Sequence, residues 1–232
     1  MQKKMMALLL AFLLLPLAAI ADDFDMSHTI AYMDAHFTCG CSRGGTGTMI
    51  SRYGLITAAH NLYCHQHGKP LKSCNFYFGA RSAGSCWYEY SGKFTYRVYE
   101  TFQNGYSSRN DIGYVVFQSP VGDETGWCGY AVYDDRYWRG ETVKISTYDY
   151  TRHLVHDFSM IYRAGDGNEA LWLDWIYGTE GGPVCIDRGD DYADPQVVAV
   201  YTSHNSDGEG HGYGRFLTSD ILRDMREDGA FR

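Results

Sequence analysis

The sequence lacks long hydrophobic runs beyond its first residues, and this absence excludes several classes of protein. After residue 21 no segment has the about 20 apolar residues that a membrane-spanning helix needs. The sequence also lacks a low-complexity linker and an obvious internal repeat. With 232 residues, of which 45% are hydrophobic and 21% charged, the composition argues against disorder. It is suited to one compact domain, or to one domain built of two barrels.

Positive charge is also scarce. The chain has 20 Lys and Arg against 28 Asp and Glu, which gives a formal net charge of −8. Proteins that bind nucleic acid usually present a basic patch, so this balance argues against a nucleic-acid partner. The acidic residues are dispersed, as on the solvated surface of a secreted protein, and therefore indicate solubility rather than a particular partner.

The first 21 residues have the pattern of a secretory signal peptide. Lys3 and Lys4 precede an apolar stretch over residues 7–15, and Ala19-Ile20-Ala21 is suited to cleavage. A membrane anchor is the alternative, but this stretch falls short of the about 20 residues needed to span. We therefore expect residues 22–232 to be secreted to the periplasm or the extracellular space as a monomer without membrane contact. Removal of the two lysines changes the net charge from −8 to −10.

Seven cysteines lie in the expected mature region: Cys39, Cys41, Cys64, Cys74, Cys86, Cys128 and Cys185. Export makes disulfides the default, yet an odd number leaves one thiol free or paired between chains. Cys64 and Cys74 close a short loop and are the pair expected to form a bridge. The same loop, Cys64-His65-Gln66-His67 with Cys74, could instead bind zinc. Because the spacing matches no closed four-ligand pattern, we assign no metal and no cofactor.

Short apolar runs separated by turn residues predict an all-β domain. The expected strands cover residues 48–51, 55–57, 111–117, 142–147, 169–175, 183–186 and 196–202. The period changes at the C-terminus, where Thr218 or Ser219 is suited to the N-cap of a helix over 218–228 and Gly229 to its end. A boundary near residue 119 would divide an N-terminal barrel (about 30–119) from a C-terminal barrel (about 120–217).

Three motifs place reactive residue types in a fixed order along the chain. Leu55-Ile56-Thr57-Ala58-Ala59-His60 ends an apolar run in a histidine, and Asn110-Asp111-Ile112-Gly113 opens another with an aspartate. Gly178-Thr179-Glu180-Gly181-Gly182-Pro183 surrounds a glutamate with glycines. A neutral imidazole can take a proton from a nucleophile, and a buried carboxylate can hold the imidazole in the right tautomer. His60 and Asp111 are suited to these two roles.

These motifs, with Gly47-Thr48-Met49-Ile50, Ala199-Val200-Tyr201-Thr202 and the final helix, resemble those of trypsin-like serine proteases of the chymotrypsin fold. Within that family they are most similar to the bacterial secreted glutamyl endopeptidases. The resemblance implies two packed six-stranded antiparallel β-barrels with the site between them, followed by a C-terminal helix. It also implies that His60 and Asp111 are catalytic-type residues and that Glu180 stands at the nucleophile position. The backbone N–H groups of Gly178 and Glu180 would form the oxyanion hole.

Glu180 departs from the pattern because the family carries its nucleophilic serine at this position. A carboxylate has no proton for His60 to remove and is a poor nucleophile towards an amide. Loss of such a nucleophile costs about 10⁶ in turnover. Neither Thr179 nor Ser203 is placed to substitute for it. We expect Glu180 to form an ion pair with protonated His60 that locks the cleft; a divalent metal held by Glu180, His60 and Asp111 is the less favoured alternative.

Other departures concern substrate specificity. Tyr201 replaces a histidine that helps glutamyl endopeptidases to bind glutamate, so an acidic preference does not follow. Trp175 replaces a small hydroxyl residue and would fill the pocket. Asp174 falls where trypsin has its pocket aspartate, but some relatives with other preferences carry aspartate there too. The expected substrate-binding residues are Asp174, Trp175, Tyr201, Thr202 and Ser203.

Two further departures concern a disulfide and the activation of a precursor. Many relatives have a disulfide beside the catalytic histidine, and here Gly45 and Asn61 replace both of its cysteines. Thr179 stands where trypsin has the aspartate that pairs with the new N-terminus, so activation of that kind is not supported.

The sequence thus favours a secreted protease homologue that is catalytically inactive and binds a peptide or protein ligand through its cleft. One alternative is an active serine-type endopeptidase that uses unexpected chemistry. A second alternative is a structural or toxin-like secreted module. Turnover that depends on His60 would favour the first alternative, and a cleft without affinity for peptides would favour the second.

Overall fold

The computed structural model describes residues 26–82, 84–132, 140–161, 163–164, 170–174, 178–186, 195–204 and 211–232. The expected signal peptide and Trp175 lie outside these residues, and both remain predictions. Within the described ranges, no helix is long and apolar enough to cross a membrane.

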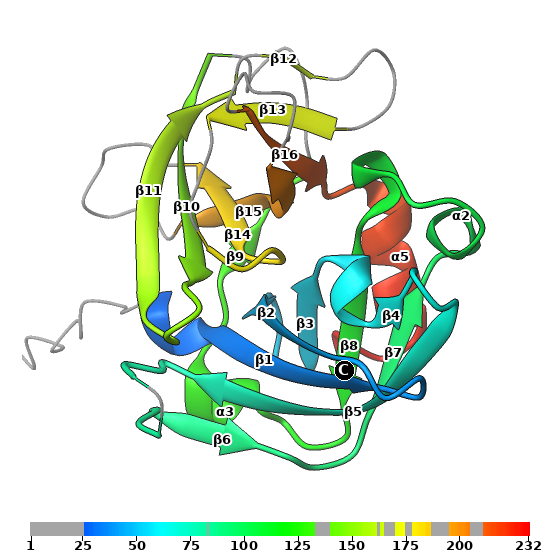
Figure 1. Ribbon diagram of the computed structural model, residues 1–232. Coiled ribbons are helices and arrows are strands. Elements are labelled where there is room, and N and C mark those ends of the chain that lie inside the picture. The colour runs from blue at the N-terminus through cyan, green and yellow to red at the C-terminus, as the bar shows by residue number, and fades with distance from the viewer. Residues whose placement is uncertain are drawn as a thin grey trace, which may run out of the picture.

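Two sheets of eight strands make up most of the described structure (Figure 1). The N-terminal sheet contains β1 (Ile30–Phe37), β2 (Ser42–Met49), β3 (Gly54–Thr57), β4 (Tyr63–Cys64), β5 (Lys69–Phe78), β6 (Tyr88–Tyr90), β7 (Phe94–Val98) and β8 (Gly113–Phe117). The C-terminal sheet contains β9 (Gly129–Tyr130), β10 (Thr142–Tyr148), β11 (Leu154–Met160), β12 (Arg163–Ala164), β13 (Ala170–Asp174), β14 (Pro183–Ile186), β15 (Gln196–His204) and β16 (His211–Phe216).

The strand order confirms the all-β prediction. The first sheet runs β4-β5-β1-β2-β3-β8-β7 with β6 beside β5, and the second runs β11-β10-β14-β15-β16-β13-β12 with β9 beside β15. Within the described ranges, the strand pairings are antiparallel except that of β9 with β15, which is parallel. Each sheet has eight strands rather than the expected six, because the short strands β4 and β6, and β9 and β12, add to them.

Alternation of side chains explains why each sheet closes around its own apolar cluster. Along β1 the buried residues include Ala31, Met33, Ala35 and Phe37, which are spaced by two as a half-buried strand requires. They pack with other residues of the N-terminal sheet, such as Phe76. A separate cluster around Val143 fills the C-terminal sheet, and a third cluster contains residues of both sheets, such as Ile56 and Val200.

The helical segments are short apart from the last. They are η1 (Met26–Thr29), η2 (Ala59–Asn61), α2 (Glu100–Gln103), η3 (Ser108–Asn110), α3 (Gly122–Thr125) and α5 (Ser219–Glu227). The expected C-terminal helix is confirmed as α5, with Thr218 as its N-cap: Thr218 Oγ1 accepts a hydrogen bond from Ile221 N at 3.3 Å. Ile221, Leu222 and Met225 are buried in a cluster that also contains residues of both sheets.

One side chain of the C-terminal sheet is anchored in the N-terminal sheet. Tyr148, at the end of β10, is fully buried. Its hydroxyl donates a hydrogen bond to the carbonyl of Ile30 and accepts one from the amide of Ala80, both at 3.0 Å. Both partners belong to the N-terminal half of the chain. The phenol therefore fixes the two sheets relative to each other next to the site.

Candidate functional site

His60 is held by a single turn of 3₁₀ helix that directly follows β3. The turn η2 is closed by the amides of Asn61 and Leu62, which donate to the carbonyls of Ala58 at 3.0 Å and Ala59 at 2.9 Å. Ala58, Ala59 and Leu62 are fully buried, so the backbone of this turn is fixed in the core. The His60 side chain itself is only 3% exposed.

Asp111 makes two hydrogen bonds with His60, although the two residues are 51 positions apart. Its Oδ1 accepts from the His60 backbone N–H at 2.9 Å, and its Oδ2 lies 2.5 Å from Nδ1 of the ring. Because a carboxylate only accepts, Nδ1 carries the hydrogen and Nε2 is the ring atom left to face the cleft. Nε2 is buried and has no hydrogen-bond partner among the described residues. This arrangement can accept a proton at Nε2.

Glu180 approaches the same ring nitrogen from the other sheet. Its Oε2 lies 3.9 Å from Nε2 of His60, and its side chain is 26% exposed. This separation is too long for a hydrogen bond but within the range of an ion pair when the imidazole is protonated. The backbone carbonyl of Glu180 accepts hydrogen bonds from Thr46 N and Asn61 Nδ2, both at 2.9 Å. The turn that carries Glu180 is thus tied to the strand and the helical turn beside His60.

The glycines around Glu180 are required by close packing. Gly181 has a φ of +102°, which glycine adopts without strain. A Cβ on Gly178 would overlap Thr147 Oγ1. The amides of Thr179 and Gly181 donate to the carbonyls of Tyr148 at 2.6 Å and Tyr201 at 2.7 Å. The expected oxyanion hole would instead use the backbone amides of Gly178 and Glu180. This role remains a prediction.

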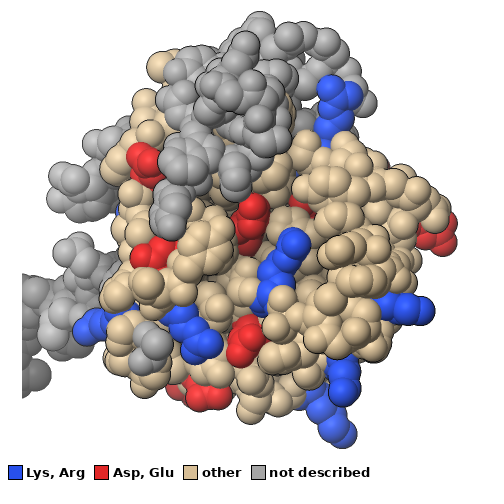
Figure 2. All heavy atoms as spheres, viewed as in Figure 1, with Lys and Arg blue, Asp and Glu red and all other residues tan. Residues whose placement is uncertain are grey.

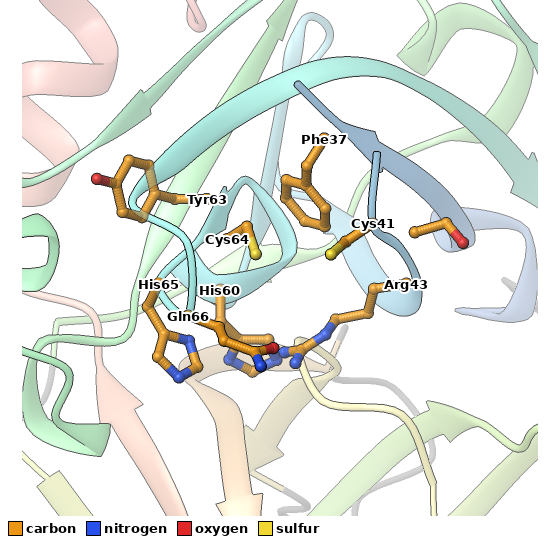
Figure 3. Close-up of a pocket in the computed structure, with 9 residues that line it drawn as sticks. Phe37, Cys41, Arg43, His60, Tyr63, Cys64, His65 and Gln66 are labelled. Carbon is orange, nitrogen blue, oxygen red and sulfur yellow. The ribbon is translucent and has the colours of Figure 1, made fainter. Parts of the chain in front are cut away.

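Two cavities of about 480 and 500 Å³ meet at His60. Both are lined by Arg43, His60 and His65. The first extends towards Tyr63, Cys64 and Cys41, whose positions around His60 are seen in Figure 3. The second extends to Glu180 and is lined by three tyrosines: Tyr32, Tyr106 and Tyr150. The face that contains the cleft carries scattered charges of both signs rather than one basic or acidic patch (Figure 2).

Electrostatics in the cleft keep two polar aromatic groups in their neutral forms. Burial raises the pKa of Tyr106 to about 12, and the negative charges of Asp111 and Glu180 add to this effect. Its hydroxyl is therefore a hydrogen-bond donor at neutral pH. Burial lowers the pKa of His65, and the positive charge of Arg43 lowers it further. The two rings stack with their centres 4.4 Å apart, which makes an aromatic wall beside His60.

The expected substrate-binding residues lie on β13 and β15 as far as they are described. Tyr201 and Thr202 on β15 are fully buried, and Thr202 Oγ1 donates to the Tyr213 carbonyl at 3.3 Å. Ser203 is half-buried, after an irregularity in the pairing of β15 with β16. Asp174 ends β13, where its backbone pairs with that of His211. Substrate binding by these residues, and by Trp175, remains a prediction.

Asn61 has a structural role that was not apparent from its position in the sequence. Its amide group donates to the Glu180 carbonyl at 2.9 Å and to Thr57 Oγ1 at 3.0 Å. A Cβ on Gly45 would lie 2.5 Å from Cγ of Asn61, so these two residues are in direct contact. The contact between the two segments is therefore kept by a hydrogen-bonding side chain where the resemblance implies a lost disulfide.

The expected disulfide between Cys64 and Cys74 was wrong, because both residues have free thiols. Cys64 pairs with Lys69 in the β4–β5 ladder, and Cys74 lies five positions further along β5, which is about 16 Å of strand. Cys74 is buried in the N-terminal sheet, whereas Sγ of Cys64 lies 3.5 Å from Nδ1 of His67. The loop is closed by strand pairing and not by a covalent bond.

Comparison with solved structures places the fold among serine proteases. A glutamyl endopeptidase solved in complex with MPD aligns at a TM-score of 0.73 and 18% identity, over 91% of this chain and 94% of that one. A thermostable serine protease from an extremophilic microorganism aligns at 0.73 and 12% identity, over 89% and 99%. A scabies mite inactivated protease paralogue aligns at 0.67 and 14% identity, over 89% and 97%. No protein-family model matches the sequence, and no curated protein sequence matches it either. The chain has the chymotrypsin-type fold of the trypsin-like serine proteases.

Proposed function

We propose that this chain is a secreted homologue of trypsin-like serine proteases that binds peptide or protein segments in the cleft beside His60 without hydrolysing them. The observation that carries the proposal is the Glu180 carboxylate 3.9 Å from Nε2 of His60. Secretion rests on the signal-peptide pattern of residues 1–21.

The chemistry at Nε2 explains why hydrolysis should fail. The pair of His60 and Asp111 can accept a proton, but an ionised Glu180 has none to give. The carboxylate also stands beside the one ring nitrogen that could activate a water molecule, and its negative charge opposes the approach of hydroxide. In the absence of a nucleophile, a bound peptide would meet at most the weak residual catalysis of a disabled site.

The walls of the cleft support binding of a peptide. Two adjoining cavities of about 480 and 500 Å³ offer room for several side chains on either side of His60. Tyr32, Tyr106 and Tyr150 supply aromatic surface with hydroxyl groups, and Arg43 supplies a charged donor that both cavities share. Tyrosine and arginine are enriched where proteins bind other proteins.

Hydrolysis of a fluorogenic peptide library by the purified mature chain tests the inactivity. We expect no turnover from the native chain or from Glu180→Gln, which keeps the shape of the side chain. Glu180→Ser should gain hydrolysis, and the double variant Glu180→Ser with His60→Ala should lose it. Turnover by the native chain that disappears in His60→Ala would refute the proposal in favour of an active endopeptidase.

Binding needs a separate measurement, because a chain without peptidase activity does not necessarily bind peptides. Fluorescence polarisation with a labelled peptide library should detect binding to the native chain and to Glu180→Gln. Arg43→Ala should weaken that binding, while Arg223→Ala, an exposed arginine on α5, should leave it unchanged. If no peptide binds and Glu180→Ser remains inactive, the cleft is not a peptide site and the chain acts as a structural module.

A further inference from the structure

Three thiols and one imidazole converge at the side of the cleft: Cys39, Cys41, Cys64 and His67. One ligand atom from each residue lies within 4.8 Å of the ligand atoms of all the others. Nδ1 of His67 is 3.5 Å from Sγ of Cys41 and 3.5 Å from Sγ of Cys64. Figure 3 shows the sulfur atoms of Cys41 and Cys64 facing each other above His60.

Two tight turns bring these residues together. In the β1–β2 turn the Phe37 amide donates to the Cys41 carbonyl at 2.9 Å, and Gly40 between the two cysteines has a φ of +90°. In the β4–β5 turn the His67 amide donates to the Cys64 carbonyl at 3.3 Å. The Thr38 amide then joins the first turn to the start of β5 by donating to Pro70 O at 3.1 Å. The backbone thus sets the four ligand positions before any ion binds.

The separations suit a tetrahedral zinc ion. With Zn–S bonds of about 2.3 Å and a Zn–N bond of about 2.0–2.1 Å, tetrahedral geometry places nitrogen about 3.6 Å from each sulfur and the sulfurs about 3.8 Å apart. Nδ1 of His67 lies 3.5 Å from the sulfur of Cys41 and 3.5 Å from that of Cys64, and every other ligand pair, including His67 with Cys39, lies within 4.8 Å. Three thiolates and one imidazole form a closed donor set of the kind that zinc occupies in structural sites.

We propose that Cys39, Cys41, Cys64 and His67 bind one structural zinc ion. On binding, each of the three thiols loses its proton to solvent and gives its sulfur lone pair to the metal, so no oxidant is required. The three cysteines have free thiols, and a disulfide between any two of them would leave the third thiol unpaired. The cysteines are half-buried and His67 is exposed, which gives the ion a path from solvent.

The zinc ion would connect the two segments that hold the wall of the cleft. Cys41 lies two residues before Arg43, and Cys64 lies four residues after His60. The same two segments touch a little further along, where Gly45 meets Asn61. A zinc cross-link would therefore stabilise the segments on which His60 and Arg43 are carried. This inference does not depend on whether the cleft binds or cleaves peptides.

Metal content of the purified mature chain, prepared without a metal-binding tag, tests the site. We expect about one zinc per chain by mass spectrometry of the elements, with release when the thiols are titrated by a mercurial reagent. Exchange for Co²⁺ should give the intense visible bands and thiolate charge-transfer absorption of tetrahedral coordination. Cys41→Ser and Cys64→Ser should retain less than about a tenth of the zinc, and His67→Gln should bind it more weakly. Cys86→Ser and His65→Gln are the matched controls that should keep it.

Several outcomes would overturn the site. It is refuted by a native chain without zinc whose peptide map shows a disulfide among Cys39, Cys41 and Cys64. Equal zinc loss in Cys86→Ser would also refute it. If the serine variants fail to fold, removal of metal from the native chain tests the site instead. A strong chelator should then lower its Tm by about 10 °C, and zinc, but not magnesium, should restore it. An unchanged Tm after complete removal of zinc would show that the ion is not structural.

Discussion

The two halves of the candidate site differ in burial and in hydrogen bonding. His60 and Asp111, from the N-terminal sheet, are 3% and 0% exposed and share two hydrogen bonds. Glu180, from the turn before β14, is 26% exposed and only approaches His60 at 3.9 Å. A buried carboxylate and imidazole that satisfy each other are costly to separate, whatever chemistry they serve. The intact pair therefore indicates a preserved fold and does not by itself show activity, whereas the residue at the Glu180 position decides whether the pair has a nucleophile to activate.

The largest expected effect tests whether His60 and Asp111 can still support peptide hydrolysis. In the Glu180→Ser background, Asp111→Asn should lower kcat/KM for peptide hydrolysis by about 10⁴, because asparagine no longer holds His60 in the required tautomer. Steady-state kinetics with the best peptide of the library measure this. Asp123→Asn, at an exposed acid paired with Arg52, should leave the rate unchanged. Equal rates with and without Asp111 would show that the two halves do not act together.

The next effect concerns the stability of the half that carries Glu180. Gly178→Ala should lower the free energy of unfolding by about 1–3 kcal/mol, because the new Cβ would overlap Thr147 Oγ1. Gly105→Ala is the matched control, since nothing lies within 4 Å of a Cβ there. Urea denaturation of both variants measures the difference. Indistinguishable midpoints would mean that the turn before β14 is looser than the packing indicates.

A smaller effect should appear at the link between the halves. Asn61→Ala removes the hydrogen bond to the Glu180 carbonyl at 2.9 Å and the one to Thr57 at 3.0 Å. We expect a loss of about 1–2 kcal/mol in the free energy of unfolding, because the Glu180 carbonyl keeps its bond from Thr46. Gln118→Ala, at an exposed side chain, is the control for denaturation. A neutral Asn61→Ala would contradict a structural role for this contact.

The smallest effect is electrostatic and involves both halves. The pKa of Tyr106 is raised to about 12 by burial and by the charges of Asp111 and Glu180, so its protonated form is favoured in the folded state. Its contribution to stability is present below pH 10 and is lost as the pH rises towards 12. It should amount to a few tenths of a kcal/mol, because the side chain is half exposed.

A difference spectrum between the native chain and Tyr106→Phe isolates this tyrosine among the 20 in the chain. Glu180→Gln should move its ionisation to lower pH, whereas Glu227→Gln, on α5, should not move it. An unshifted titration in Glu180→Gln would place the Glu180 charge further from Tyr106 than the structure does.

The sequence predicted those parts of the molecule that have a local signal. Short apolar runs that became β3, β8 and β14, and a helix with Thr218 as its cap, depend on neighbours a few residues apart and were confirmed. The strands β1 and β5 were not among those expected, although β1 alternates buried and less buried residues. The meeting of His60 and Asp111 depends on sheet pairing between β3 and β8 across 51 positions. No spacing rule shows such a contact, and only the resemblance to proteases indicated it.

The cysteines show where the sequence was misleading. Short spacing suggested that Cys64 pairs with Cys74, yet a strand carries Cys74 away from Cys64 as soon as β5 begins. The residues that do meet Cys64 come from another hairpin, 23 and 25 positions earlier in the chain, at Cys41 and Cys39. A group of ligands formed by two separate turns has no contiguous pattern that could be recognised before the strands are paired.

Tyr148 has a consequence for the kinetics of recognition. Its hydroxyl joins the backbones at Ile30 and Ala80, and its own carbonyl receives the Thr179 amide one residue before Glu180. A hinge motion that widened the cleft would have to break these bonds in the buried interior. A ligand should therefore meet a preformed slot, with an association rate set by diffusion and orientation rather than by a slow opening step.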